Sequence, residues 1–155
     1  MIAAIDIADD AWARVKDLEE LTERAIEAAL DHAGTDKNVE IGVLFANDEE
    51  AARLNTQWRR KDYAPNILSF PAPEMHDVPE GEPRPLGDLI LASGTVAREA
   101  EEQGKPLTSH LTHLIVHGTL HLLGFDHLDK RDAERMEAAE IAILAGLGVP
   151  DPYLT

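Results

Sequence analysis

Three histidines lie close together in the segment HGTLHLLGFDH, at positions 117, 121 and 127. Side chains four residues apart project from the same face of a helix, so His117 and His121 can bind one metal ion together. Gly124 can end that helix in the left-handed conformation, which lets His127 turn back as a third ligand. Three protein ligands leave one position open, as in catalytic zinc sites. The spacing therefore predicts one zinc ion per chain at the end of a helix, although nickel or copper would also bind imidazoles.

Two further histidines precede this group on the same predicted helix. A trio of His113, His117 and His121 would extend about 12 Å along two helical turns, which is too long for a single ion. We therefore interpret His113 as a core residue or a residue that supports a ligand, and we expect His110 to be exposed.

The residue after the first histidine separates this motif from a known protease pattern. Metzincin proteases share the histidine spacing and the glycine, but they carry Glu at that place as the general base. Here the residue is Gly118. Peptide hydrolysis is therefore an alternative in which Asp126 or a metal hydroxide would have to replace the missing base.

Four basic residues gather at Arg53, Arg59, Arg60 and Lys61 in an otherwise acidic chain. The sequence has 14 Lys and Arg against 30 Asp and Glu, a formal net charge of −16, so it should repel nucleic acid except where cations cluster. Cations near a helix C-terminus also stabilise the helix, which is the simpler explanation for Arg53 and Arg60. Arg59 and Lys61 precede a predicted strand, and we expect them to bind an anion such as phosphate.

Two carboxylates are candidates for a role beside the histidines. Asp126 is adjacent to His127, where it is either a proton acceptor, a group that orients the ligand, or simply a cap of the turn. Asp88, at the start of a predicted strand, is a weaker candidate for orienting a ligand.

The elements that must position these residues follow from the hydrophobic pattern and from Gly and Pro punctuation. Helices are expected at 10–32, 47–58, 95–103, 106–123 and 130–144. Strands are expected at 1–8, 39–46, 67–70 and 88–92. The proline-rich segment 71–86 predicts an exposed loop, either a lid or a docking surface for a partner.

This order predicts a single α+β domain over 1–155, in which a small mixed sheet of about four strands is packed by about five helices. The zinc site would lie at the end of a central helix. Cysteine is absent, which excludes disulfides and thiolate ligands. Because no apolar run is long enough to span a bilayer and the first residues do not resemble a secretory signal, we expect a cytoplasmic protein without membrane contact.

The motif HGTLHLLGFDH resembles the signature of the YbeY family, bacterial rRNA maturation factors described as metal-dependent, single-strand-specific endoribonucleases. The block WRRKDYAPNILSFP resembles that family's arginine-containing segment and its LSFP strand, and LGDLIL resembles its next strand. The resemblance covers essentially the whole chain. It implies zinc ligands His117, His121 and His127, a functional Arg59, and a mixed sheet surrounded by helices.

The resemblance also implies a substrate and partners: single-stranded rRNA, with processing of the 16S 3′ end, ribosome quality control, and association with the small ribosomal subunit and its proteins. On this hypothesis the zinc ion and Arg59 promote phosphodiester cleavage, and Lys61 holds a neighbouring phosphate. Two positions depart from the family pattern without touching a ligand: Pro65 stands where Thr is common, and Phe125 where Tyr is frequent.

Two alternatives remain open at this point. One is a zinc hydrolase of another substrate class, including peptides. The other is a ribosome assembly factor without catalytic activity, whose zinc only supports the fold. The sequence also does not choose between water and a ribose 2′-hydroxyl as the attacking group.

Overall fold

The computed structural model describes residues 2–73, 78–126 and 128–154, and within these ranges it forms one mixed sheet with helices on both faces. The strands, in the spatial order β1-β2-β4-β3, are β1 (Ala3–Ile7), β2 (Val39–Ala46), β4 (Arg84–Ala92) and β3 (Ile67–Pro71). Strands β1, β2 and β4 run parallel to one another, and β3 is antiparallel to β4 at the sheet edge. The helices are the short 3-10 helix η1 (Asp10–Arg14), α1 (Leu18–Ala33), α2 (Asp48–Arg59), α3 (Ser93–Gln103), α4 (Leu107–Leu122) and α5 (Lys130–Gly146). The predicted α+β class, mixed four-stranded sheet and five α-helices are confirmed.

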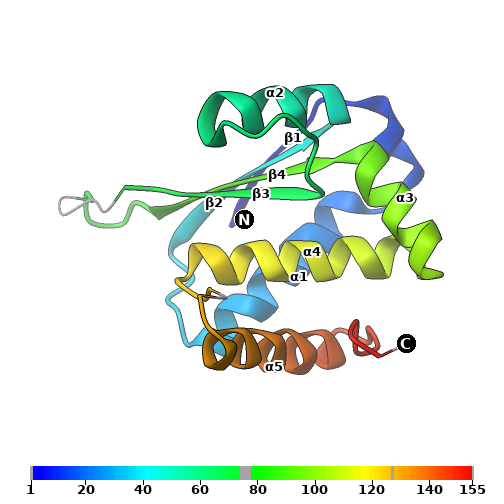
Figure 1. Cartoon of the computed structure of the whole chain (residues 1–155). Coiled ribbons are helices and arrows are strands. Elements are labelled where there is room, and N and C mark those ends of the chain that lie inside the picture. The colour runs from blue at the N-terminus through cyan, green and yellow to red at the C-terminus, as the bar shows by residue number, and fades with distance from the viewer. Residues whose placement is uncertain (1, 74–77, 127, 155) are drawn as a thin grey trace.

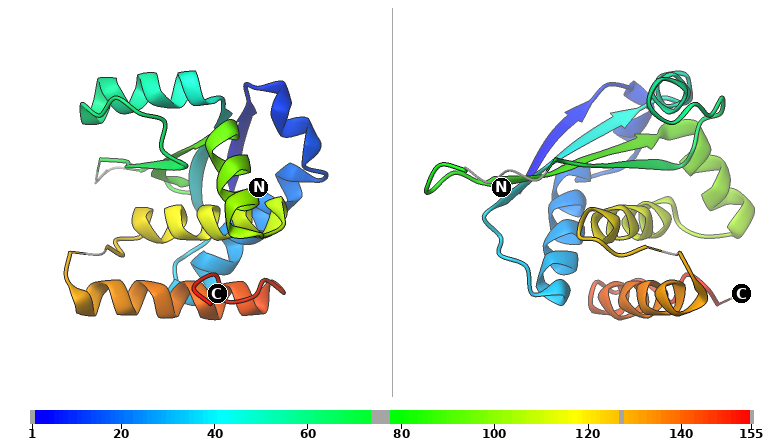
Figure 2. Two further views of the ribbon diagram at one scale, coloured as in Figure 1. Left: turned by 45° about the vertical axis from the view of Figure 1, so that its right-hand side comes forward. Right: turned by 60° about the vertical axis from the view of Figure 1, so that its left-hand side comes forward.

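The helices are divided unequally between the two faces of the sheet. Helix α2 lies alone over one face, whereas α1 and α4 pack against the other, and α5 forms a further layer outside α4 (Figure 1, Figure 2). None of the described helices is long and apolar enough to cross a lipid bilayer.

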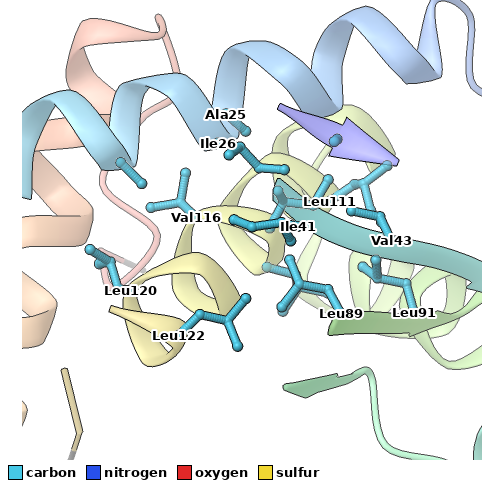
Figure 3. Packing of buried hydrophobic residues seen from close by; sticks show 14 of the residues in the cluster. Ala25, Ile26, Ile41, Val43, Leu89, Leu91, Leu111, Val116, Leu120 and Leu122 are labelled. Carbon is cyan, nitrogen blue, oxygen red and sulfur yellow. The ribbon is translucent and has the colours of Figure 1, made fainter. Parts of the chain in front are cut away.

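The main core lies between the sheet and the α1–α4 layer (Figure 3). Alternate residues of β2, among them Ile41 and Val43, point into this layer, as period-two alternation in a strand requires. They meet side chains such as Ile26 from α1 and Val116 from α4. Burial of each such side chain contributes about 1.5–3 kcal/mol, which makes this the layer that fixes α4 in place.

The first predicted helix is interrupted in the structure. Instead of running over 10–32, the chain forms η1, breaks, and restarts as α1 after Asp17, whose backbone is left-handed with φ of 53°. The indole Nε1 of Trp12 donates to the carbonyl of Ala46 at 2.8 Å, and the Trp12 ring packs edge-on against Phe45. These contacts with the end of β2 hold the η1 turn apart from α1, which helical periodicity alone does not reveal.

Strand β4 begins four residues earlier than predicted, so part of the segment 71–86 is strand rather than exposed loop. Leu86 is buried, and Pro85 pairs opposite Glu40 at an irregularity in the β2–β4 register. A bulge of this kind tolerates a proline that cannot donate to the ladder. Of the predicted loop, residues 74–77 lie outside the described residues, and its role as a lid or a docking surface stays a prediction.

Helix α4 lies close against the sheet at Gly118. A Cβ atom added there would lie 2.8 Å from Ile67 Cδ1 and 2.9 Å from Leu89 Cδ2, closer than real contacts allow. The absence of a side chain at Gly118 is therefore what lets α4 lie flat on β3 and β4.

We predict that Gly118→Ala destabilises the fold by about 1–3 kcal/mol, because the added methyl group overpacks the contact with β3 and β4. Urea unfolding followed by circular dichroism measures the change. The matched control is Gly146→Ala in α5, where an added Cβ meets no atom within 4 Å. We expect that control to be neutral or to stabilise by up to about 1 kcal/mol. Equal effects of the two substitutions would contradict the close approach at Gly118.

Candidate metal centre

His117 and His121 converge at the C-terminal end of α4. Their Nε2 atoms lie 3.0 Å apart, and both residues line a cavity of about 390 Å³ together with the start of β3 and residues 124–126. Because Gly118 faces the sheet, His117 and His121 project from one side of that contact, into the cavity beside β3. The side-by-side placement predicted from the four-residue spacing is the one observed.

The other nitrogen of each ring is engaged by an acceptor, which determines where the ring protons lie. His121 Nδ1 donates to the carbonyl of Phe125 at 3.0 Å, and His117 Nδ1 donates to Glu140 Oε1 at 2.6 Å. A carbonyl and an ionised carboxylate can only accept, so both Nδ1 atoms carry a proton. When the rings are neutral, as in metal ligands, both Nε2 atoms then present a lone pair. Two lone pairs facing each other at this distance repel, and a cation between them removes the repulsion. The donor set therefore fits a metal ion bound by neutral imidazoles.

The turn after α4 supplies one of these acceptors. Gly124 has a φ of 99°, in the left-handed region, and its N–H donates to the carbonyl of His121. The next N–H, that of Phe125, donates to the carbonyl of Leu120. This turn brings the Phe125 carbonyl to Nδ1 of His121. The predicted role of Gly124 in ending the helix is confirmed. His127 lies outside the described residues, so its assignment as third ligand stays a prediction.

Glu140 of α5 is the component of this site that the sequence analysis missed. Its side chain is completely buried and accepts hydrogen bonds from His117, from His113 Nε2 at 3.2 Å and from the hydroxyl of Tyr153 at 2.5 Å. Burial raises the pKa of the Glu140 carboxyl, but the hydrogen bonds from His113, His117 and Tyr153 outweigh it and lower the pKa to about 2. The carboxylate is therefore ionised although it is buried.

His113, His117 and Glu140 bring one possible ligand atom each to within 4.8 Å of one another, which makes them a second candidate set of metal ligands. The candidate ligands therefore form two sets that share His117. One set is His117 and His121, whose Nε2 atoms face the cavity, and the other is His113, His117 and Glu140. A signal for Glu140 does exist in the sequence, since it occupies a position on the same face of α5 as the buried Met136 and Ile143, where a solvated acid is unexpected.

Arg59, the last residue of α2, lines the same cavity as the two histidines. Its Nη2 donates to the carbonyl of Ser69 at 2.7 Å, and its guanidinium lies 5.3 Å from the centre of the Phe70 ring. A guanidinium has five N–H donors, so the bond to Ser69 positions the group while leaving donors for an anion in the cavity.

The remaining predicted residues differ in their relation to the cavity. Asp126 is exposed and lines it at the turn after α4. Lys61 is exposed and is not one of the described residues that line the cavity. Its backbone instead closes the end of α2, where its carbonyl accepts from the hydroxyl of Thr56. Any role for Lys61 in the cavity would require its long side chain to extend toward bound substrate.

Two secondary predictions are wrong. His110 is only 4% exposed, and its Nε2 pairs with Glu99 at 2.9 Å, because α3 packs across the N-terminal half of α4. Asp88 points to the α2 face of the sheet, where its carboxylate occupies the space above Gly42. Adjacent residues of a strand face opposite sides, so the burial of Leu89 against α4 turns Asp88 away from the histidines.

The position of Gly118 also bears on the peptidase alternative. A glutamate at this place would project into Ile67 and Leu89 of the sheet rather than into the cavity. Among the described residues that line the cavity, Asp126 is the acid available as a base. The motif therefore shares the ligand spacing of the metzincins without the room for their general base.

Comparisons with known proteins agree with this geometry. The family model described as Endoribonuclease YbeY matches residues 5–148. Curated relatives named "Endoribonuclease YbeY" include those of Rhodopseudomonas palustris, 47% identical over 95% of this chain and 78% of the relative, and Azorhizobium caulinodans, 48% identical over 95% and 92%. A third relative with this name, from Magnetococcus marinus, is 57% identical over 75% of this chain and 84% of its own.

Among solved structures, the solution structure of TM1509 from Thermotoga maritima matches with a TM-score of 0.58 at 23% identity, covering 99% of this chain and 96% of that one. This match shows the shared fold. Together, the fold and the cavity define an α+β enzyme in which two imidazoles and a guanidinium face one space. The chain belongs to the Endoribonuclease YbeY family.

We predict that His121→Ala weakens the binding of Zn²⁺ to the protein by at least 100-fold, because it removes one of the two converging Nε2 donors. Competition with a chromophoric chelator measures the affinity. The matched control is His32→Ala, an exposed histidine near the end of α1, which should leave the affinity unchanged. Loss of affinity in both variants, or in neither, would show that the ion binds elsewhere.

Proposed function

We propose that this protein is a zinc-dependent endoribonuclease that cleaves single-stranded rRNA during ribosome maturation, including the 16S 3′ end. The observation that carries the proposal is the convergence of His117 Nε2 and His121 Nε2 in the cavity that Arg59 also lines. Membership of a family described as endoribonucleases supports the reaction class. The resemblance of the motifs to rRNA maturation factors supports the substrate.

The residues that would hold zinc are His117, His121 and, from the sequence motif, His127. When bound, the ion supplies Lewis acidity toward a phosphoryl oxygen or a water molecule. As zinc ligands the two described imidazoles would be neutral, with Nδ1 donating to a fixed acceptor and Nε2 left to bind the ion. Neutral ligands leave the ion with its full positive charge, which suits an anionic substrate.

Arg59 is the residue we assign to the phosphate of the scissile bond. Its guanidinium stays charged at all relevant pH values and can bind two phosphoryl oxygens at once. The bond to Ser69 and the stacking on Phe70 fix the group before substrate arrives. A fixed donor stabilises the charge that develops at phosphorus without reorganising during the reaction.

Asp126 and Lys61 have subsidiary roles in this proposal. Asp126 lines the cavity at the turn after α4, and we assign to it the role of accepting the proton of the attacking hydroxyl or water. Lys61 would contact a phosphate outside the cavity, two residues along the chain from Arg59.

The charge of the chain bears on how RNA reaches the cavity. With a net charge of −16, the protein repels polyanions at long range and attracts them where cations gather, as at Arg59 and its neighbours. We therefore propose that a partner on the small ribosomal subunit brings the substrate to the cavity. Such recruitment predicts weak, salt-sensitive cleavage by the isolated protein.

We predict that His117→Ala and His127→Ala each abolish cleavage of a fluorescently labelled single-stranded RNA while the protein stays folded. Purified zinc-loaded protein is tested against RNA, single-stranded DNA and casein, with His32→Ala as the control. Cleavage of casein alone would favour the peptidase alternative. Loss of zinc that unfolds the protein, with no substrate cleaved by the wild type, would favour a purely structural zinc. Full activity in both variants would refute the proposal.

We predict that Arg59→Gln lowers the cleavage rate by about 10²–10³-fold, the effect of removing one transition-state donor. It should also reduce the slope of log K against log salt for RNA binding by about one unit, because one phosphate contact is lost. Fluorescence anisotropy at several salt concentrations measures the slope. The matched control is Arg53→Gln on the same helix, because Arg53 is exposed and engaged with Glu50. Equal effects at the two positions would mean that Arg59 acts only through the overall charge.

A further inference from the structure

The buried carboxylate of Glu140 links the histidine cavity to the segment that follows α5. Glu140 Oε1 accepts from His117 and His113 on α4, and Oε2 accepts from the hydroxyl of Tyr153. A buried, ionised carboxylate is strongly destabilising unless nearly all of its acceptor sites are used. Its three donors meet that requirement, and they come from two separate parts of the chain.

Tyr153 lies in the segment after α5, outside any helix, and backbone contacts of residues 151–153 hold it near Glu140. The N–H of Tyr153 donates to the side chain of Asp151, and Lys105 Nζ donates to the carbonyl of Pro152 at 2.7 Å. The ring of Tyr153 also packs edge-on against His113, with ring centres 5.6 Å apart. The backbone before Tyr153 and the ring itself are thus both held, with the hydroxyl directed at Glu140.

We propose that Glu140, His113 and Tyr153, here called the Glu140 cluster, are positioning residues that set the tautomer and orientation of His117 as a metal ligand. Glu140 accepts the Nδ1 proton and so directs the Nε2 lone pair into the cavity. Tyr153 and His113 hold the carboxylate at the angle at which it meets His117. The proposal rests on the proposed function only in that a metal ion occupies the histidine cavity.

The competing interpretation is a metal ion bound directly by His113, His117 and Glu140, and the distances argue against it. A tetrahedral site with bonds of about 2.1 Å separates its ligand atoms by roughly 3.4 Å. His117 Nδ1 and Glu140 Oε1 are 2.6 Å apart, which is a hydrogen-bond distance. Such an ion would also have to be a second one, because the Nε2 of the same ring faces the cavity.

The test measures Zn²⁺ affinity and stoichiometry in the full chain, so that it does not depend on RNA cleavage. In Glu140→Gln the amide keeps the shape but loses the charge, and we expect the affinity to fall about 10–100-fold, as for other groups that orient a metal-bound histidine. In Tyr153→Phe we expect a smaller fall of several-fold. The control is Tyr63→Phe, an exposed tyrosine for which we expect no change. Thermal melting of the metal-free proteins checks that each variant folds.

A spectroscopic measurement separates positioning from a general effect on the fold. With Co²⁺ in place of zinc, Glu140→Gln should change the visible absorption bands, because the geometry of one ligand changes, while Tyr63→Phe leaves them as in the wild type. Unchanged affinity and spectra in both Glu140→Gln and Tyr153→Phe would overturn the proposal. Two ions per chain, one of them lost in Glu140→Gln while the other binds normally, would overturn it in favour of a second metal site. If His117→Ala binds zinc as tightly as the wild type, the proposed function itself fails, which is a different result.

Discussion

The contact of α4 with the sheet at Gly118 is the constraint from which the geometry of the site follows. It brings the helix axis close to β3 and β4 and so determines which side of α4 meets the sheet. Gly118 contacts the sheet, and His117 and His121 face the cavity beside it. The same approach sets the distance between those rings and the edge strand that carries Ser69. Because Arg59 is bound to Ser69, the sheet helps to place the guanidinium relative to the imidazoles.

Proton positions at the site are determined by acceptors that lie behind the histidines. The Phe125 carbonyl depends on a left-handed glycine, and the Glu140 carboxylate depends on the packing of α5 outside α4. Each layer of the fold therefore contributes one requirement of the cavity. The sheet provides the Ser69 carbonyl that binds Arg59, and α4 provides the imidazoles of His117 and His121. Helix α5 provides the Glu140 carboxylate that orients His117.

Much of this arrangement could be predicted from the sequence, because it depends on local spacing. The sequence spacing predicts that His117 and His121 lie side by side, and a glycine marks the end of their helix. Hydrophobic periodicity predicts the order of helices and strands. What could not be predicted depends on tertiary contacts. Glu140 is one of 30 acids, and only packing shows that it is buried. His110 resembles a surface histidine until α3 covers it, and the break after η1 depends on a bond between Trp12 and a strand 34 residues away.

Arg59 also has a consequence for the sheet itself. Strand β3 pairs with β4 on one side only, so its other edge presents backbone groups to which a strand from another molecule could add. The guanidinium of Arg59 donates a hydrogen bond to one of those groups, the carbonyl of Ser69, and so places a positive charge at the edge. Charged side chains on outer strands are a common protection against self-association. Removal of Arg59 would therefore leave the Ser69 carbonyl open to a strand from another molecule, a consequence for solubility that is separate from chemistry.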